Sequence, residues 1–233
     1  MAAAGVHFYQ WASLAAVIAA TVFTVRVVER GRWRLGLFVA PRIAAIDFGR
    51  GTIFTVLLIG GADVAILATT NLRHIRSDGF PWLELIAVFA PAVFHEELLF
   101  RGYLFQKIRI WNRYAAIGAT SAVFAMLHGF NHGITAVAMV NLTIAGVLLA
   151  LAYERYQRLW FPIGIHLAWN LLSGPILGYG VSGYVAQTTL FRTIGSGPAL
   201  LTGGAFGIEG SIWMAAVELG GIFWLSRGFR KDA

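Results

Sequence analysis

Six polar side chains that could do chemistry stand inside otherwise apolar stretches of the sequence. They are His95, Glu96, Glu97, His128, His166 and Asn170. An ionisable group inside a membrane-spanning helix costs roughly a few kcal/mol, so such a group indicates a functional site by default. Carboxylates serve as general bases, and His and Asn side chains donate hydrogen bonds to a developing oxyanion. Together these residues predict one site for general-base chemistry.

Residues 95–99 read HEELL and are similar to the zincin motif HExxH. In that motif two histidines one helical turn apart bind zinc, and the glutamate activates water. Leu99 stands where the second histidine is needed. The sequence therefore does not contain a zincin site.

Helical spacing gives the two adjacent glutamates different roles. Glu97 and Arg101 are four residues apart, so they can form an ion pair on one face of a helix. Glu96 lies roughly 140° from Arg101 at about 100° per residue. One carboxylate is neutralised while the other stays free for proton transfer. We therefore expect a structural pair, Glu97 with Arg101, and a reactive Glu96.

By the same four-residue spacing, His128 lies on the same helix face as Phe124, and His166 lies on the same helix face as Asn170. A single histidine on an apolar helix is usually a packing residue, but polar groups from three helices favour a shared interior site. The other ionisable residues in or beside the apolar stretches, to which the sequence assigns no role, are Asp63, His74, His95, His132 and Glu218.

The composition describes the elements that must position these residues. The chain has 233 residues, of which 58% are hydrophobic and 12% charged, and its mean hydropathy is +0.70. Apolar spans of about 20 residues each would occupy most of this length, so we expect one integral-membrane domain over residues 1–233. The absence of cysteine from the sequence excludes disulfides, thiolate metal ligands and a cysteine nucleophile.

The predicted fold is an all-α transmembrane bundle of about seven spans, with six to eight allowed, around a polar cavity. The first span has no basic flank or cleavage site typical of a signal peptide, so we interpret it as retained. A glycine-rich stretch up to Gly210 could contain an eighth span. The seven candidate spans are residues 6–25, 52–70, 80–100, 114–128, 134–152, 160–181 and 211–226.

The net charge of +7 comes from basic residues in the connections between these spans. Fifteen of the 18 Lys and Arg residues lie in alternate connections and the C-terminal tail, and three lie in the others. Positive residues accumulate on the cytoplasmic side of a membrane, so we expect the N-terminus outside and the C-terminus in the cytoplasm. The charge thus indicates membrane orientation, and we expect no nucleic-acid partner.

Three ordered motifs carry a resemblance to a known family. They are Glu96-Glu97-x-x-x-Arg101, Phe124-x-x-x-His128 and His166-x-x-x-Asn170. This set resembles the motifs of the CAAX-protease and bacteriocin-processing (CPBP or Abi) family of intramembrane endopeptidases, over about residues 82–180. Residues 203–211 are also similar to a glycine-rich segment of bacterial members, although Ile208 stands where a proline is common. No catalytic role is transferred to Glu209.

The resemblance implies an enzyme that hydrolyses a peptide bond of a membrane-associated substrate with glutamate-activated water and no cofactor. Glu96 would be the catalytic glutamate, His128 would position the water, and His166 with Asn170 would stabilise the oxyanion. Glu97 and Arg101 would hold their helix. The expected substrate is a membrane-embedded or lipid-anchored peptide or protein, and the expected location is a bacterial inner membrane.

Two other functions remain open at this point. One is a zinc metalloprotease with Glu96, His128 and His166 as ligands. The other is a membrane scaffold or sensor without catalysis, or a proton-coupled transporter, although no inverted repeat is visible. A geometric difficulty also remains, because Glu96 and His128 lie about 21 and 22 Å from the inner ends of their helices but His166 only about 12 Å. The sequence defines neither the substrate nor the oligomeric state.

Overall fold

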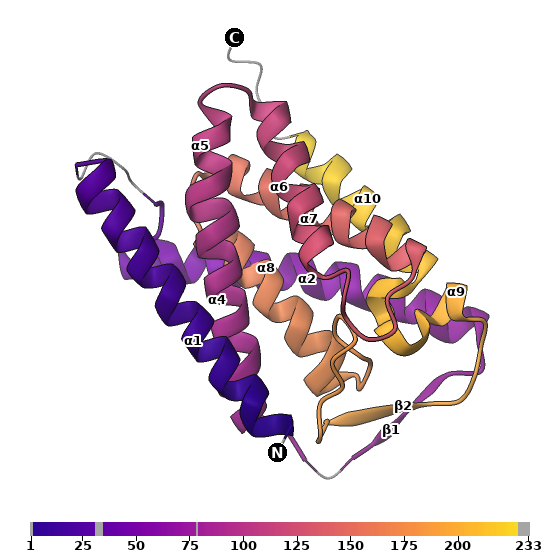
Figure 1. The fold of residues 1–233 in the computed structure, drawn as a ribbon. Coiled ribbons are helices and arrows are strands. Elements are labelled where there is room, and N and C mark those ends of the chain that lie inside the picture. The colour runs from indigo at the N-terminus through magenta and orange to yellow at the C-terminus, as the bar shows by residue number, and fades with distance from the viewer. Residues whose placement is uncertain (1, 31–34, 78, 228–233) are drawn as a thin grey trace.

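The computed structural model describes residues 2–30, 35–77 and 79–227 as a helical bundle with a small two-stranded sheet at one end (Figure 1). The first helix begins near that end, and the last helix ends at the opposite one (Figure 1). The long helices are α1 (Ala2–Phe23), α2 (Pro41–Thr69), α4 (Ala90–Leu99), α6 (Arg113–Leu127), α7 (Ala136–Tyr156), α8 (Trp160–Leu171) and α10 (Ile212–Ser226). The predominantly helical fold agrees with the prediction.

Three helices of the described residues are long and apolar enough to cross a membrane: Phe8–Val28, Pro41–Thr69 and Ala136–Tyr156. Two shorter apolar helices are Arg113–Leu127 and Ile212–Ser226. The chain is therefore a membrane protein with a mostly helical fold. The count of seven spans stays a prediction, because the remaining segments are shorter than a full crossing or are interrupted by π-helical turns.

One continuous helical segment carries the first motif. It consists of α3 (Trp82–Glu84), α4 and α5 (Phe105–Arg109), which are joined by π-helical turns at Leu85–Phe89 and Phe100–Leu104. Pro91, at the start of α4, lacks the N–H that a regular helix needs, and the preceding π turn accommodates this loss. The helix thus extends beyond the predicted end at residue 100 and holds Glu96, Glu97 and Arg101 on one element.

Helix α2 begins at Pro41, well before the predicted start at residue 52. The charged residues in its first turns had suggested a connection. In the structure Asp47 is buried and accepts a hydrogen bond of 3.2 Å from Nη2 of Arg158, and it also lies 3.7 Å from Arg50. Partners from other parts of the chain therefore allow the helix to include a charged turn.

Small residues let the helices approach closely. Helix α2 packs along α8, where a Cβ on Gly51 would lie 2.8 Å from the backbone N of Ile165. Helix α6 packs on α7, where a Cβ on Gly146 would lie 2.8 Å from Cα of Ser121. Backbone contacts through glycine are the usual packing mode where lipid removes the hydrophobic drive between helices.

The glycine-rich stretch folds as a cap on the bundle and contains no long helix. Between Gly178 and Gly210 the structure has strand β2 (Phe191–Ile194), the four-residue helix α9 (Ala199–Thr202) and short 3₁₀ turns. Gly207 has a φ of +103°, a conformation that other residues rarely adopt. None of these elements is long enough to cross a membrane, so the stretch holds no eighth span.

The sheet is anchored by an acid that the sequence left isolated. Strand β1 (Arg73–Arg76) pairs antiparallel with β2, and His74 lies opposite Thr193. Oδ1 of Asp63 accepts a 2.7 Å hydrogen bond from the hydroxyl of Tyr179 and lies 2.9 Å from Nε2 of His74. Asp63 and His74 thus hold the sheet against the end of α2.

Candidate active site

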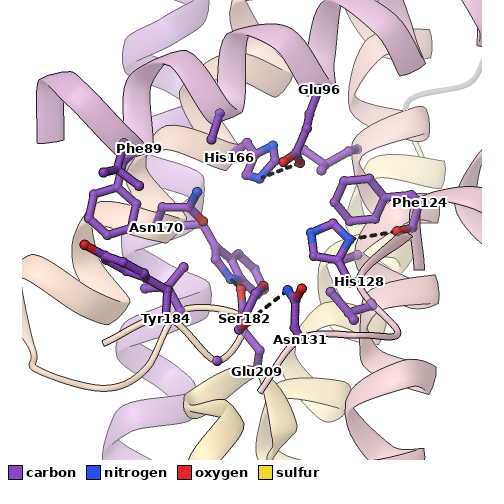
Figure 2. Close-up of a pocket in the computed structure, with 18 of the residues that line it drawn as sticks. Phe89, Glu96, Phe124, His128, Asn131, His166, Asn170, Ser182, Tyr184 and Glu209 are labelled. Atoms are coloured by element: carbon purple, nitrogen blue, oxygen red, sulfur yellow. Dashed lines mark hydrogen bonds and ion pairs between the residues drawn. The ribbon is translucent and has the colours of Figure 1, made fainter. Parts of the chain in front are cut away.

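The motif residues line a single cavity (Figure 2). Glu96 comes from α4, His128 from the C-terminal cap of α6, and His166 and Asn170 from α8. The cavity has a volume of about 350 Å³. This is near the lower limit for small-molecule pockets, so it fits a short peptide segment and not a folded substrate.

Glu97 and Arg101 together connect three helices next to this cavity. The side chain of Glu97 is wholly buried, and Oε1 accepts a 3.0 Å hydrogen bond from Nη1 of Arg101, as the four-residue spacing predicts. The same oxygen lies 2.9 Å from Nδ1 of His166. Arg101 also donates a 3.2 Å hydrogen bond from Nη2 to the carbonyl oxygen of Gly146 on α7. Glu97 and Arg101 therefore fix α4, α7 and α8 relative to one another.

His166 has a defined orientation because of this contact. An ionised carboxylate only accepts hydrogen bonds, so Nδ1 of His166 carries a hydrogen and donates it to Glu97. The other ring nitrogen, Nε2, lies 3.8 Å from Oε2 of Glu96. The two side chains therefore meet across the cavity. The difference in depth counted from the helix ends, which the sequence left open, does not keep them apart.

His128 is oriented by its own helix. Its Nδ1 lies 2.8 Å from the carbonyl oxygen of Phe124, which can only accept, so Nδ1 carries the hydrogen. In the neutral ring Nε2 is then a hydrogen-bond acceptor, on the side turned away from that carbonyl (Figure 2). The Phe124 ring packs 4.6 Å from the His128 ring and 6.1 Å from the His166 ring, measured between centroids. Phe124 thus acts as the spacer between the two histidines.

Asn170 lies one helical turn after His166 and is mostly buried on the cavity wall. The spacing of four residues places both side chains on one face of α8. The neighbouring His95, by contrast, lies 3.0 Å from the carbonyl oxygen of Pro91 through Nδ1 and is not among the cavity-lining residues. His95, to which the sequence assigned no role, thus lies outside the described cavity wall.

The structure adds Glu209, to which the sequence gave no role. Oε1 of Glu209 accepts a 2.8 Å hydrogen bond from Nε1 of Trp169, and Oε2 accepts from the backbone N and the hydroxyl of Ser182. Asn131, three residues after His128, donates a 2.9 Å hydrogen bond to the carbonyl oxygen of Ser182. Glu209 and Ser182 therefore bind the loops around α6 and α8 into one wall.

The loop after Ser182 closes the cavity on the side of α3. Tyr184 lies on the cavity wall and donates a 3.1 Å hydrogen bond to Oε2 of Glu84. Burial, together with the negative charge of Glu84, raises the pKa of Tyr184 to about 12, so its hydroxyl keeps its hydrogen at neutral pH. Gln10 of α1 and His132 also line the cavity, although the sequence assigned neither to the site.

The zinc interpretation requires three donors close enough to share one ion. Among residues 2–30, 35–77 and 79–227, no three His, Asp or Glu side chains meet this condition. Glu96 and His166 approach each other, but the arrangement does not bring His128 into the same coordination shell. The donor set of Glu96, His128 and His166 thus does not fit a zinc ion in this conformation.

Residues 78–172 match the family described as Rce1-like, type II CAAX prenyl endopeptidase. No curated protein and no solved structure matches the chain significantly. The matched segment contains all three motifs, from Glu96 to Asn170, whose side chains line or support the cavity described above. This match, which covers less than half of the chain, supports a relationship of residues 78–172 to the CPBP, or CAAX-protease, family.

Proposed function

We propose that the chain is an intramembrane endopeptidase that hydrolyses a peptide bond of a membrane-associated substrate with glutamate-activated water. The observation that supports this proposal most directly is the contact of 3.8 Å between Oε2 of Glu96 and Nε2 of His166 inside the cavity. Oε2 of Glu96 is buried and has no hydrogen-bond partner among the described residues, so no protein donor competes with a water molecule for this oxygen. A buried carboxylate next to a water site is the arrangement that general-base hydrolysis needs.

In the proposed reaction Glu96 removes a proton from water, and the resulting hydroxide attacks the carbonyl carbon of the substrate. Nε2 of His128, an acceptor when the ring is neutral, orients that water through its second hydrogen. The tetrahedral intermediate collapses by breaking the C–N bond. The proton held by Glu96 then passes to the leaving amine, which restores the carboxylate.

Asn170 and His166 stabilise the oxyanion in this proposal. The amide of Asn170 donates in any protonation state, whereas Nε2 of His166 carries a hydrogen only when the ring is doubly protonated, because Nδ1 is already bound to Glu97. The carboxylates of Glu97 and Glu96, at 2.9 and 3.8 Å, supply the opposite charges for that form. Donors fixed in a low-dielectric cavity stabilise a developing negative charge without rearrangement.

The substrate in this proposal is a membrane-embedded or lipid-anchored peptide. Most of the cavity wall is apolar and includes Val88, Phe89, Leu142 and Ile165, which fits an apolar segment beside the scissile bond. A small apolar cavity within a membrane bundle admits an extended chain, whose backbone groups are free to pair with site residues. The proposed location is the inner membrane of a bacterium.

A cleavage assay on purified protein in detergent tests the proposal. Internally quenched peptides are incubated with the parent chain and with Glu96→Gln, which keeps the side-chain volume but removes the basicity. We expect cleavage by the parent and a loss of about 10²–10⁴ in rate for the variant, the usual effect of removing a general base. Equal cleavage by both proteins would contradict the role of Glu96.

The natural substrate is sought with the same variant. Glu96→Gln expressed in native membranes should retain an uncleaved partner, which mass spectrometry of the purified complex identifies. A folded parent chain that cleaves neither the peptides nor this partner would indicate a non-catalytic scaffold.

A further inference from the structure

We propose that Glu209 makes the cavity selective for an internal peptide segment and against a substrate that ends in a free carboxylate beside the scissile bond. This inference rests on the proposed endopeptidase function and names the substrate class of the same site. A C-terminal CAAX substrate would require the opposite selectivity, because its cleavage releases a short fragment that carries the terminal carboxylate of the substrate.

The first observation is the charge of the cavity wall. Two carboxylates, those of Glu96 and Glu209, line the cavity, and no Lys or Arg is among the described residues that line it. Peptide and ligand carboxylates in proteins are generally held by Arg or Lys side chains or by helix N-termini. The described wall therefore offers a terminal carboxylate no Lys or Arg side chain, and the charge of a protonated His166 ring is already balanced by Glu97 and Glu96.

The second observation concerns the nearest buried cation on the motif helix. Arg101 is wholly buried and lies outside the lining set. Its Nη1 is bound to Glu97 and its Nη2 to the carbonyl oxygen of Gly146. Using Arg101 to bind a substrate carboxylate would require breaking the connection between α4, α7 and α8, so this charge is not available.

The third observation is the fixed position of Glu209. Its two oxygens accept hydrogen bonds from Trp169 and from two atoms of Ser182, which holds the carboxylate at the wall. Trp169 directly precedes Asn170, the proposed oxyanion donor, and both line the cavity. A peptide whose scissile carbonyl lies at Asn170 therefore has its flanking residues close to the negative charge of Glu209.

The negative charge of Glu209 disfavours a peptide whose terminal carboxylate lies near the scissile bond. A chain that ends three residues after the scissile bond places its carboxylate within about 10 Å of that bond, because an extended residue spans about 3.3–3.6 Å. Two like charges at such distances repel each other more strongly in a partly dehydrated cavity than in water. A chain that continues through the cavity, or that carries a neutral or cationic group there, avoids this repulsion.

The test compares two forms of one peptide. An internally quenched peptide that the purified protein cleaves is shortened to end three residues after the mapped scissile bond, with either a carboxylate or a carboxamide terminus. We expect kcat/KM to be about tenfold or more higher for the carboxamide, given the strength of like-charge repulsion at low dielectric. Equal values, or a preference for the carboxylate, would overturn the proposal.

Two variants separate charge from structure. Glu209→Gln removes the negative charge and should bring the ratio of the two kcat/KM values to within about threefold of one, as the repulsion is lost. Ser182→Ala removes one hydrogen bond to Glu209 but leaves the negative charge of Glu209 in place. This variant should therefore keep the parent's ratio of the two kcat/KM values, even if both values fall. A ratio that falls equally in both variants would contradict a charge effect.

A measurement on the parent chain alone covers the case in which Glu209→Gln does not fold. Non-cleavable versions of the two peptides, with a reduced scissile bond, compete with a cleaved peptide, and their inhibition constants should differ in the same direction. Failure of the parent to cleave any peptide would contradict the proposed function itself. Cleavage without discrimination would contradict only the selectivity.

Discussion

Nδ1 of His166 lies 2.9 Å from Oε1 of Glu97, the same oxygen that accepts the hydrogen bond from Arg101. The glutamate that helical spacing assigned to a structural pair is thus also the residue that orients a histidine of the cavity. The contact with Glu97 keeps a hydrogen on Nδ1 of His166 and sets the direction in which Nε2 points. Structural support and site geometry therefore share one carboxylate.

We expect Glu97→Gln to lower both stability and turnover. Oε1 of the glutamine can still accept from both Arg101 and Nδ1 of His166, but the side chain no longer carries the negative charge that favours the doubly protonated ring, the form in which Nε2 donates. Turnover per folded molecule should fall about 10²-fold, as for other disturbed oxyanion donors. Breaking the buried pair should also cost about 3–5 kcal/mol of unfolding free energy. The measurements are kcat on monodisperse protein and the thermal unfolding midpoint.

Arg101→Ala is the matched control, because it removes the other partner of the pair and leaves Glu97 in contact with His166. It should lose stability to a similar extent but keep more turnover per folded molecule than Glu97→Gln. If folded Glu97→Gln protein turned over like the parent, the contact with His166 would have no part in catalysis.

Asn170→Ala should leave weak residual activity. Removing one oxyanion donor typically costs about 10²–10³ in rate, and His166 remains as a second donor. The loss should appear mainly in kcat, because the amide contributes most when negative charge develops. His95→Ala is the control, since His95 is adjacent to Glu96 in sequence but lies outside the cavity. A comparable loss of kcat in both variants would point to general damage of the bundle.

The elements that carry the motifs could be predicted because apolar stretches and four-residue spacings are local signals. Of the six polar side chains singled out by type, four line one cavity, Glu97 contacts one of these four, and His95 lies outside the cavity. The π turn at Phe100–Leu104 could not be predicted, because one extra residue in a helical turn does not change the composition of the sequence in a recognisable way. It is this turn that carries Arg101.

The contacts that could not be predicted join residues far apart in the chain. Glu209 receives its hydrogen bonds from Trp169 and Ser182, and Asp63 pairs with His74 and Tyr179 across the sheet. Each acid looked isolated because no partner stands at a helical spacing from it. The early start of α2 was missed for the same reason, as the partner of Asp47 is Arg158.

Metal removal separates the two proposed mechanisms. We expect the purified protein to retain full activity after dialysis against a strong chelator, because the described residues provide no three-donor metal site. Elemental analysis should find less than one zinc ion per chain in the active preparation. A stoichiometric zinc ion whose removal abolishes cleavage, and whose return restores it, would instead favour the metalloprotease and require a rearrangement of Glu96, His128 and His166.

The orientation of the bundle can be tested at the two ends of α6. The connection before this helix is flanked by Arg109 and Arg113, which both pair with Glu154, whereas the connection after it has no Lys or Arg between residues 129 and 135. Positive residues mark the cytoplasmic side, so we propose that the first connection is cytoplasmic and the second is outside.

Two exposed aromatic residues, one in each connection, are suitable positions for single cysteines. The sequence contains no cysteine that would interfere with their labelling. Trp111 is 87% exposed in the first connection and Phe130 is 99% exposed in the second. With a membrane-impermeant maleimide on intact cells, Phe130→Cys should be labelled and Trp111→Cys only after permeabilisation. The opposite pattern would reverse the orientation, and labelling of both from one side would show that α6 does not cross.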